Sequence, residues 1–113
     1  MAIEIWHNPR CSKSRETLQL LEQHNASVRL YLEDAPSAEE IRSVLKKLGI
    51  SARDLLRSGE DEYKTLNLAD NSLTEDDLIN AMVQAPRLIQ RPIVIKGNKA
   101  AIGRPPELVL EIL

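Results

Sequence analysis

The chain is organised around one polar loop, His7-Asn8-Pro9-Arg10-Cys11-Ser12-Lys13-Ser14-Arg15. Before this loop, apolar and polar residues alternate, which predicts a short strand over residues 2–6. After it, apolar residues recur at helical spacing, which predicts a helix over residues 12–23. We therefore expect Cys11, the single cysteine, where a strand ends and a helix begins.

Cys11 is expected to be reactive. A lone cysteine is often a buried small hydrophobe, but the neighbours of Cys11 in the loop are polar, charged or proline. The unpaired N–H groups and the macrodipole at a helix N-terminus stabilise an anion, and Arg10, Lys13 and Arg15 add positive charge. Such surroundings lower the pKa of a cysteine, and the same N-terminus can bind an oxyanion.

Length and composition exclude several classes of protein. The 113 residues suit a single domain, and a net charge of −2 gives no reason to expect a nucleic-acid partner. One cysteine excludes an internal disulfide and a thiolate zinc cluster, so an oxidised Cys11 needs a thiol from another molecule. With no visible signal peptide or membrane span, we expect a cytoplasmic protein without a bound metal or cofactor.

The first part of the chain predicts a βαβ unit. A second strand is expected over residues 28–32, so strand, helix and strand follow within some thirty residues. In an open sheet of parallel strands, ligands bind beyond the carboxyl ends of the strands. Cys11 lies at that position.

The middle of the chain, residues 37–89, is expected to be an all-helical insertion. Ser37 and Glu40 have the spacing of a capping box, and a shorter helix should follow from Ser51 to Gly59 with Arg57 in its last turn. The weakly helical residues 60–69 have Tyr63 and Leu66 as expected anchors. A further helix, capped by Thr74, should end at Pro86.

The last part of the chain predicts a ββα unit. Residues 91–95 form the expected third strand, residues 96–99 a hairpin turn and residues 100–102 the fourth strand. Pro105 and Pro106 then suit the start of a final helix. The fold class is thus α/β, one domain over residues 1–113, with the helical insertion between the second and third strands.

Three sharper motifs are absent from the loop. A dithiol redox site needs Cys-x-x-Cys, but position 14 is Ser, and a phosphatase-type Cys-x5-Arg loop would need Arg where Thr17 stands. No glycine precedes Gly49, which excludes a glycine-rich phosphate loop. The remaining Cys-x-x-Ser is the pattern of a monothiol site. His7 is either a structural residue of the loop or a group that acts on the thiol, and sequence leaves both open.

Several blocks together resemble the glutaredoxin-dependent arsenate reductase family. They are HNPRCSKSRETL, LLR at residues 55–57, YKTLNLAD from Tyr63, RPIVI, and IGRPPE, and they occur in order over nearly the whole chain. The resemblance implies a thioredoxin-like fold with a helical insertion, in agreement with the pattern above. It is closest to shorter members, because the chain stops at Leu113 where longer members carry a further tail.

The resemblance also implies an activity. Cys11 would attack arsenate, glutathione would attack the adduct as a co-substrate, and glutaredoxin would recycle the system with arsenite as product. His7 matches a histidine linked to a lowered cysteine pKa, and Pro92 matches a proline that follows a cis peptide bond. The arginines expected to surround the oxyanion are Arg57, Arg91 and Arg104, and the loop residues expected to contact it are Asn8, Arg10, Ser12 and Ser14.

Two other functions remain open from the sequence. A related branch of the fold regulates transcription by binding RNA polymerase, although its redox switch uses Cys-x-x-Cys and Ser14 removes that switch. A general glutathione-dependent monothiol reductase would also suit Cys-x-x-Ser.

Overall fold

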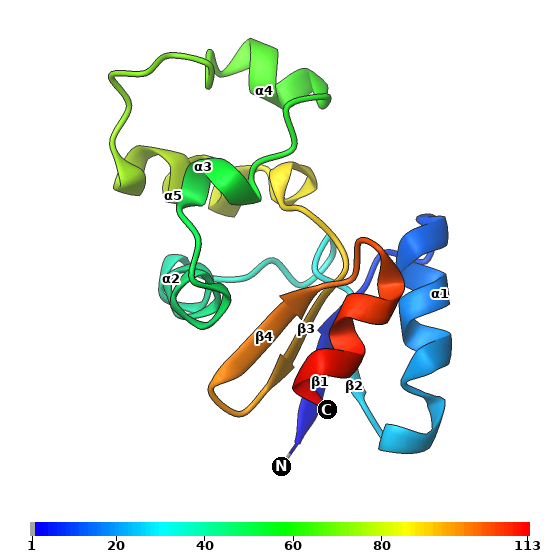
Figure 1. Cartoon of the computed structure of the whole chain (residues 1–113). Helices are drawn as coiled ribbons and strands as arrows, with labels where there is room; N and C mark the ends of the chain where they lie inside the picture. The colour runs from blue at the N-terminus through cyan, green and yellow to red at the C-terminus, as the bar shows by residue number, and fades with distance from the viewer. Residues whose placement is uncertain (1) are drawn as a thin grey trace. The chain divides into compact units, whose positions relative to one another are not determined.

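The computed structural model describes residues 2–113, which separate into two compact units. One unit runs to Asp34 and resumes over Arg91–Leu113, and the other is Ala35–Gln90. The first unit holds all the strands and the Cys11 loop (Figure 1). The helical stretch expected over residues 37–89 falls inside the second unit.

The first unit contains a four-stranded sheet in the order β2-β1-β3-β4. β1 (Ile3–Trp6) pairs in parallel with β2 (Ser27–Arg29) and antiparallel with β3 (Ile93–Lys96). β4 (Lys99–Ile102) pairs antiparallel with β3 through a tight turn. The prediction of a βαβ unit followed by a ββ hairpin is therefore confirmed.

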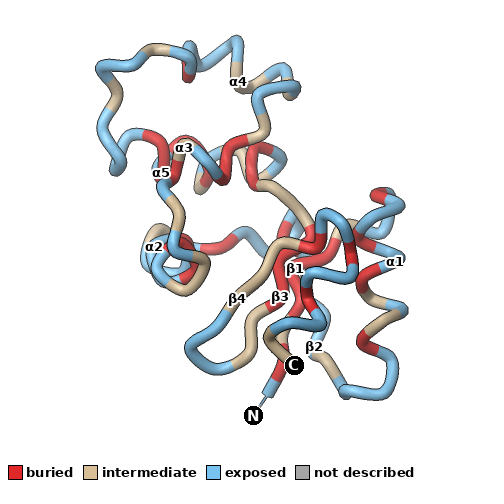
Figure 2. Tube along the Cα trace, viewed as in Figure 1, coloured by how far each residue is buried: buried red, intermediate tan, exposed pale blue. Residues whose placement is uncertain are grey.

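One face of this sheet is covered by two helices. α1 (Ser12–Leu20) continues into the 3-10 turn η1 (Glu22–His24), and the chain ends in the 3-10 helix η3 (Pro106–Ile112). Both helical segments contribute to a buried cluster with the central strands, whose members are Ile3, Ile5, Leu21, Val94 and Val109. Figure 2 shows this burial along β1 and β3, while the edge strand β2 is more exposed.

The largest boundary differences from the sequence prediction in this unit are at the ends of the second strand and the first helix. The second strand ends at Arg29 instead of residue 32, because the carbonyl of Leu30 accepts the N–H groups of Glu33 and Asp34 and turns the chain. The first helix was expected to reach residue 23, but its α-helical part ends at Leu20 and a 3-10 turn follows.

Two peptide bonds before proline are cis in this unit. The Arg91-Pro92 bond is cis, as the resemblance implied. The Arg104-Pro105 bond is also cis, which the sequence did not predict.

The second unit is built almost entirely of helices. Its α-helices are α2 (Ala38–Leu48), α3 (Ala52–Leu55), α4 (Asp61–Thr65) and α5 (Glu75–Gln84), and the 3-10 turn η2 is Pro86–Leu88. The predicted caps are confirmed, since capping boxes close the N-termini of α2 at Ser37 and of α5 at Thr74. Gly49 ends α2 with a φ of 71°, in the left-handed region that glycine tolerates.

Two sequence predictions for this unit are wrong. Arg57 does not lie in the last turn of a helix, because α3 ends at Leu55 and Leu56 forms an antiparallel bridge with Ile89. Leu66 does not anchor the following segment, since its side chain is 41% exposed. Leu68 is the buried leucine of that segment, at 3% exposure.

Candidate active site

Cys11 is the N-cap residue of α1, as the sequence predicted. Its backbone N–H donates to the carbonyl of Asn8 at 3.0 Å, and its own carbonyl accepts the N–H of Arg15 at 3.0 Å, which starts the helix. Its φ of −97° and ψ of 123° are extended. The residue is only 9% exposed and is therefore largely buried.

The loop before Cys11 is held by its own side chains. Asn8 Oδ1 accepts the N–H of Arg10 at 3.0 Å, and Arg15 Nη1 donates to the carbonyl of Pro9 at 2.9 Å. Asn8 is half-buried, whereas Arg10 and Ser12 are exposed on either side of Cys11. The side chains of Asn8 and Arg15 thus shape the turn that presents the cysteine.

The surroundings of Cys11 favour its thiolate. Burial of the thiol raises its pKa, but the backbone N–H of Ser14, the charge of Arg91, the N–H of Lys13 and the side chain of Arg104 together bring the pKa below its usual value. Arg104 Nη1 lies 3.9 Å from Sγ. A helix N-terminus and two guanidinium groups therefore act on one sulfur.

Arg91 precedes β3 and Arg104 follows β4, so both lie at the open end of the β3–β4 hairpin. Arg104 Nη1 also donates to the carbonyl of Arg91 at 3.2 Å, so the two residues are linked directly. Gly103, which precedes Arg104, donates its N–H to the carbonyl of Pro92 at 2.9 Å. The sequence alone could not establish that these arginines and the cysteine come together.

Gly103 is a residue of this site that sequence reasoning missed. An added Cβ at position 103 would lie 2.8 Å from Pro92 Cγ and even closer to Thr17 Oγ1. The chain between β4 and η3 can therefore approach α1 only without a side chain here. In the sequence, the position of this glycine between a predicted strand and Arg104-Pro105 was the signal that could have indicated a close approach.

His7 contacts Ser14 inside the unit. His7 Nδ1 lies 2.6 Å from Ser14 Oγ, and this hydroxyl also accepts the N–H of Asn8 at 3.0 Å. Burial, with the nearby charge of Arg15, lowers the pKa of His7 below its usual value. The Ser14 side chain, expected from sequence to contact an oxyanion, is fully buried on these partners.

Arg57 lies in the helical unit, where it contacts Glu60 and Arg87. Arg57 Nη1 forms an ion pair with Glu60 Oε1 at 2.7 Å, and Glu60 Oε2 also pairs with Arg87 Nη2 at 2.9 Å. The role of Arg57 beside an oxyanion stays a prediction from the resemblance.

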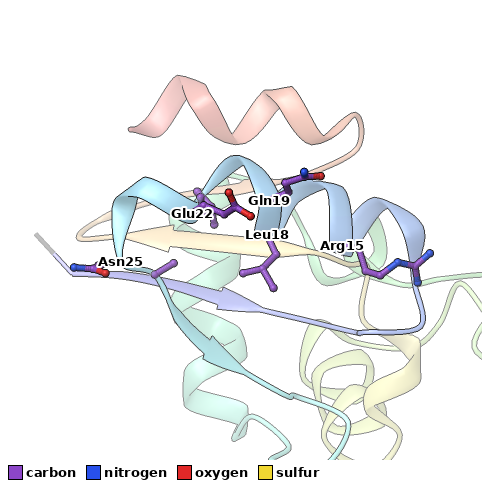
Figure 3. A pocket seen from close by; sticks show the side chains of 7 residues that line it. Arg15, Leu18, Gln19, Glu22 and Asn25 are labelled. Carbon is purple, nitrogen blue, oxygen red and sulfur yellow. The ribbon is translucent and has the colours of Figure 1, made fainter.

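A cavity of about 530 Å³ lies along α1 and η1 (Figure 3). Figure 3 shows Leu18 pointing from the helix toward the strands, with the polar side chains of Arg15, Gln19, Glu22 and Asn25 around it. Cys11 does not line this cavity. We place the chemistry at Cys11, because the cavity brings no nucleophile together with a base.

Two observations concern membranes and metals. No helix within residues 2–113 is long and apolar enough to cross a membrane. Over the same described residues, no group of three or more His, Cys, Asp or Glu side chains is placed to hold a metal ion.

The fold and a comparison with known proteins together assign this chain to a protein family. The sheet order, the helix after β1 and the cysteine at its N-terminus define a thioredoxin-like fold. The sequence model of the ArsC family matches residues 6–112. The chain belongs to the ArsC family.

Individual relatives agree with this assignment. An arsenate reductase from Haemophilus influenzae is 50% identical over the whole of both chains. The uncharacterized protein YfgD of Escherichia coli K12 is 58% identical over 98% of this chain and 96% of its own. A solved structure described as an arsenate reductase from Vibrio cholerae superposes with a TM-score of 0.95 at 50% identity, and covers 100% of this chain and 98% of that one.

Proposed function

We propose that this protein is an arsenate reductase in which the Cys11 thiolate is the nucleophile. The observation that carries the proposal is the meeting at one sulfur of the α1 N-terminus, Arg91 and Arg104. A nucleophile and positive charge for its anionic substrate thus share one place. The names of the full-length relatives supply the substrate class.

Electrostatics explain why the arginines are needed. Arsenate is an anion at neutral pH, so attack by a thiolate brings two negative charges together. Planar guanidinium groups bind tetrahedral oxyanions through paired hydrogen bonds. Arg91 and Arg104, with N–H groups of the loop, offset the repulsion and stabilise charge in the transition state. By the family resemblance, Arg57, Arg10, Ser12 and Asn8 complete the oxyanion contacts.

The proposed reaction balances with thiols from outside the chain. Cys11 sulfur forms a bond to arsenic as an oxygen leaves as water, and glutathione displaces a second oxygen in the same way. A thiol of glutaredoxin then attacks the glutathione sulfur, so a disulfide forms and the arsenic keeps the electron pair. Water cleaves the remaining sulfur–arsenic bond. The net result is arsenate plus two thiols giving arsenite, a disulfide and one water.

The one-cysteine sequence requires this external reductant, because Cys11 has no partner for an internal disulfide. Glutathione and glutaredoxin are therefore proposed as co-substrate and partner, with no bound cofactor. Their use places the reaction in the reducing cytoplasm.

The test measures arsenite formed from arsenate in the presence of glutathione and glutaredoxin. The wild-type protein should turn over, and Cys11→Ser should lose activity on the order of 10⁴-fold or more, since the nucleophile is gone. Arsenate should also slow alkylation of Cys11 by iodoacetamide. No arsenite and no protection by arsenate would overturn the proposal, and turnover of a glutathione mixed disulfide alone would favour a general thiol reductase.

A further inference from the structure

Ser14 links the end of β1 to the first turn of α1. Its side chain is fully buried, and its hydroxyl has two polar contacts, His7 Nδ1 at 2.6 Å and the N–H of Asn8 at 3.0 Å. The backbone N–H of the same residue helps to lower the pKa of the Cys11 thiol. One residue therefore connects the buried histidine with the thiolate.

The positions of the protons in this group follow from donor and acceptor counts. The Asn8 N–H can only donate, so it occupies a lone pair of Ser14 Oγ. If His7 Nδ1 also donated to this oxygen, the Ser14 hydroxyl hydrogen would have no acceptor among the contacts found. A buried donor without an acceptor is unfavourable. The hydroxyl must therefore donate to Nδ1.

We propose that Ser14 is a positioning residue whose hydroxyl donates to His7 Nδ1 and holds the imidazole neutral, with its proton on Nε2. His7 then affects Cys11 indirectly. Its Nδ1 accepts the hydrogen bond of Ser14 and so fixes the loop, and its ring carries no positive charge that could act on the sulfur. Ser14 does so without its side chain touching the oxyanion. The relevance to catalysis rests on the proposed function, but the tests below read the ionisation of Cys11 itself.

The charges around His7 agree with a neutral ring. The ring is buried, and the guanidinium of Arg15, also positive, lowers the pKa of His7. An imidazolium would be desolvated and repelled there. In a neutral histidine, the hydrogen-bond partner of one ring nitrogen determines which nitrogen carries the proton. The Ser14 hydroxyl is that partner for His7.

The first test compares three substitutions of His7. In Asn, the side-chain oxygen can occupy the place of Nδ1, so His7→Asn should keep the pH profile of Cys11 alkylation close to that of the wild type. His7→Ala and His7→Gln lose an acceptor at that place, and below the wild-type midpoint they should be alkylated about 2- to 10-fold more slowly, the effect of one buried hydrogen bond. If His7→Asn is slowed as much as His7→Ala, a cationic role is favoured and the proposal fails.

The second test removes the donor. Ser14→Ala should slow alkylation about as much as His7→Ala, and the double variant should be no slower than either single one, because both lose the same bond. Unchanged alkylation in Ser14→Ala, or additive effects, would overturn the proposal. His24→Asn is the matched control, since His24 is exposed on η1 and should leave the profile unchanged.

The third test needs no substitution at the site. Long-range ¹H–¹⁵N correlation spectra of the wild type, assigned with His24→Gln, should show a neutral His7 protonated at Nε2 while Cys11 is a thiolate. An imidazolium, or a proton on Nδ1, would overturn the proposal even in a protein that reduces arsenate. Conversely, the expected tautomer in a protein without arsenate turnover would leave the positioning role intact and reject the function.

Discussion

The three longest α-helices within residues 2–113, α1, α2 and α5, begin in two contrasting ways. α2 and α5 are closed by capping boxes, in which Ser37 pairs with Glu40 and Thr74 with Asp77, and their first turns are acidic. α1 begins at Cys11 with no side-chain cap hydrogen bond and no acidic residue in its first turn. The first N–H groups of α2 and α5 are thus paired with side chains of their own helix, whereas those of α1 have no side-chain cap.

The N-termini of α2 and α5 contribute to the stability of their helices, whereas the N-terminus of α1 acts on Cys11. At α2 and α5 a side-chain oxygen accepts an N–H and the carboxylates complement the macrodipole, which stabilises each helix. At α1 the N–H groups of Lys13 and Ser14 act on the Cys11 sulfur instead. An acid or an oxygen cap here would compete with the thiolate and with an incoming oxyanion.

Among variants that keep Cys11, the largest effect is expected from removing the positive charge of Arg104 beside the N-terminus of α1. Arg104→Ala should lower arsenate turnover by about 10²–10³-fold, since one donor to the developing charge is lost. It should also slow Cys11 alkylation at low pH, because Arg104 helps to lower the thiol pKa. Steady-state arsenite formation and the alkylation profile measure the two effects.

Arg104→Lys is the matched control for this prediction. Lysine keeps the charge but loses the planar fork of donors, so turnover should fall between that of the wild type and that of Arg104→Ala. Circular dichroism should show a folded protein in both variants. Wild-type turnover in a folded Arg104→Ala would remove Arg104 from the site.

The next largest effect concerns the glycine that lets Arg104 reach this helix end. Gly103→Ala introduces a methyl group 2.8 Å from Pro92 Cγ, and overpacking of this kind costs about 1–3 kcal/mol in the free energy of unfolding. Urea titration measures the loss. Gly59→Ala is the control, because nothing lies within 4 Å of its added Cβ and no loss is expected. Equal stability of the two variants would contradict the close approach at Gly103.

A smaller effect on stability is expected at the capped N-terminus of α5. Thr74→Ala removes the hydroxyl that accepts the N–H of Asp77 at 3.1 Å and should cost about 1 kcal/mol in stability. Alkylation of Cys11 should not change, because the cap serves α5 alone. Thr74→Ser keeps the oxygen and should restore most of the stability. Slower alkylation of Cys11 in Thr74→Ala would show that the capped N-terminus of α5 and the uncapped N-terminus of α1 do not have separate roles.

Local signals explain how much of the fold the sequence predicts. The helix caps at Ser37 and Thr74 and the hairpin around Gly97 involve residues close together in the chain, and all occur as expected. The errors arise where distant partners decide. Leu56 leaves its helix because it pairs with Ile89, and no local pattern announces a bridge between residues so far apart.

The candidate site divides in the same way. The position of Cys11 at the start of α1 follows from the strand and helix patterns on either side of it. That the charges of Arg91 and Arg104 act on the sulfur depends on the pairing of β3 with β1. The burial of Ser14 depends on the contact of its side chain with His7. The residue types predicted an oxyanion site at Cys11, and the tertiary structure shows which side chains act on its sulfur.

The smallest effect on stability, and the sharpest test of the contrast, comes from giving α1 an acidic first turn. Ser12 is exposed at the first position of the helix, so Ser12→Asp adds a charge there without filling the core. In a Cys11→Ser background it should raise the free energy of unfolding by about 0.3–1 kcal/mol at low ionic strength, as acids do at helix N-termini. Ser12→Asn, similar in size and uncharged, is the control.

With Cys11 present, the same substitution should cost function. The new carboxylate repels the thiolate, so the pKa of Cys11 should rise and its alkylation profile should move to higher pH. Arsenate should protect the cysteine less well, because the substrate is also an anion. Added salt should reduce both effects, since the charge is exposed. If Ser12→Asp stabilised the protein and left alkylation and protection unchanged, the absence of acids from the first turn of α1 would have no bearing on its chemistry.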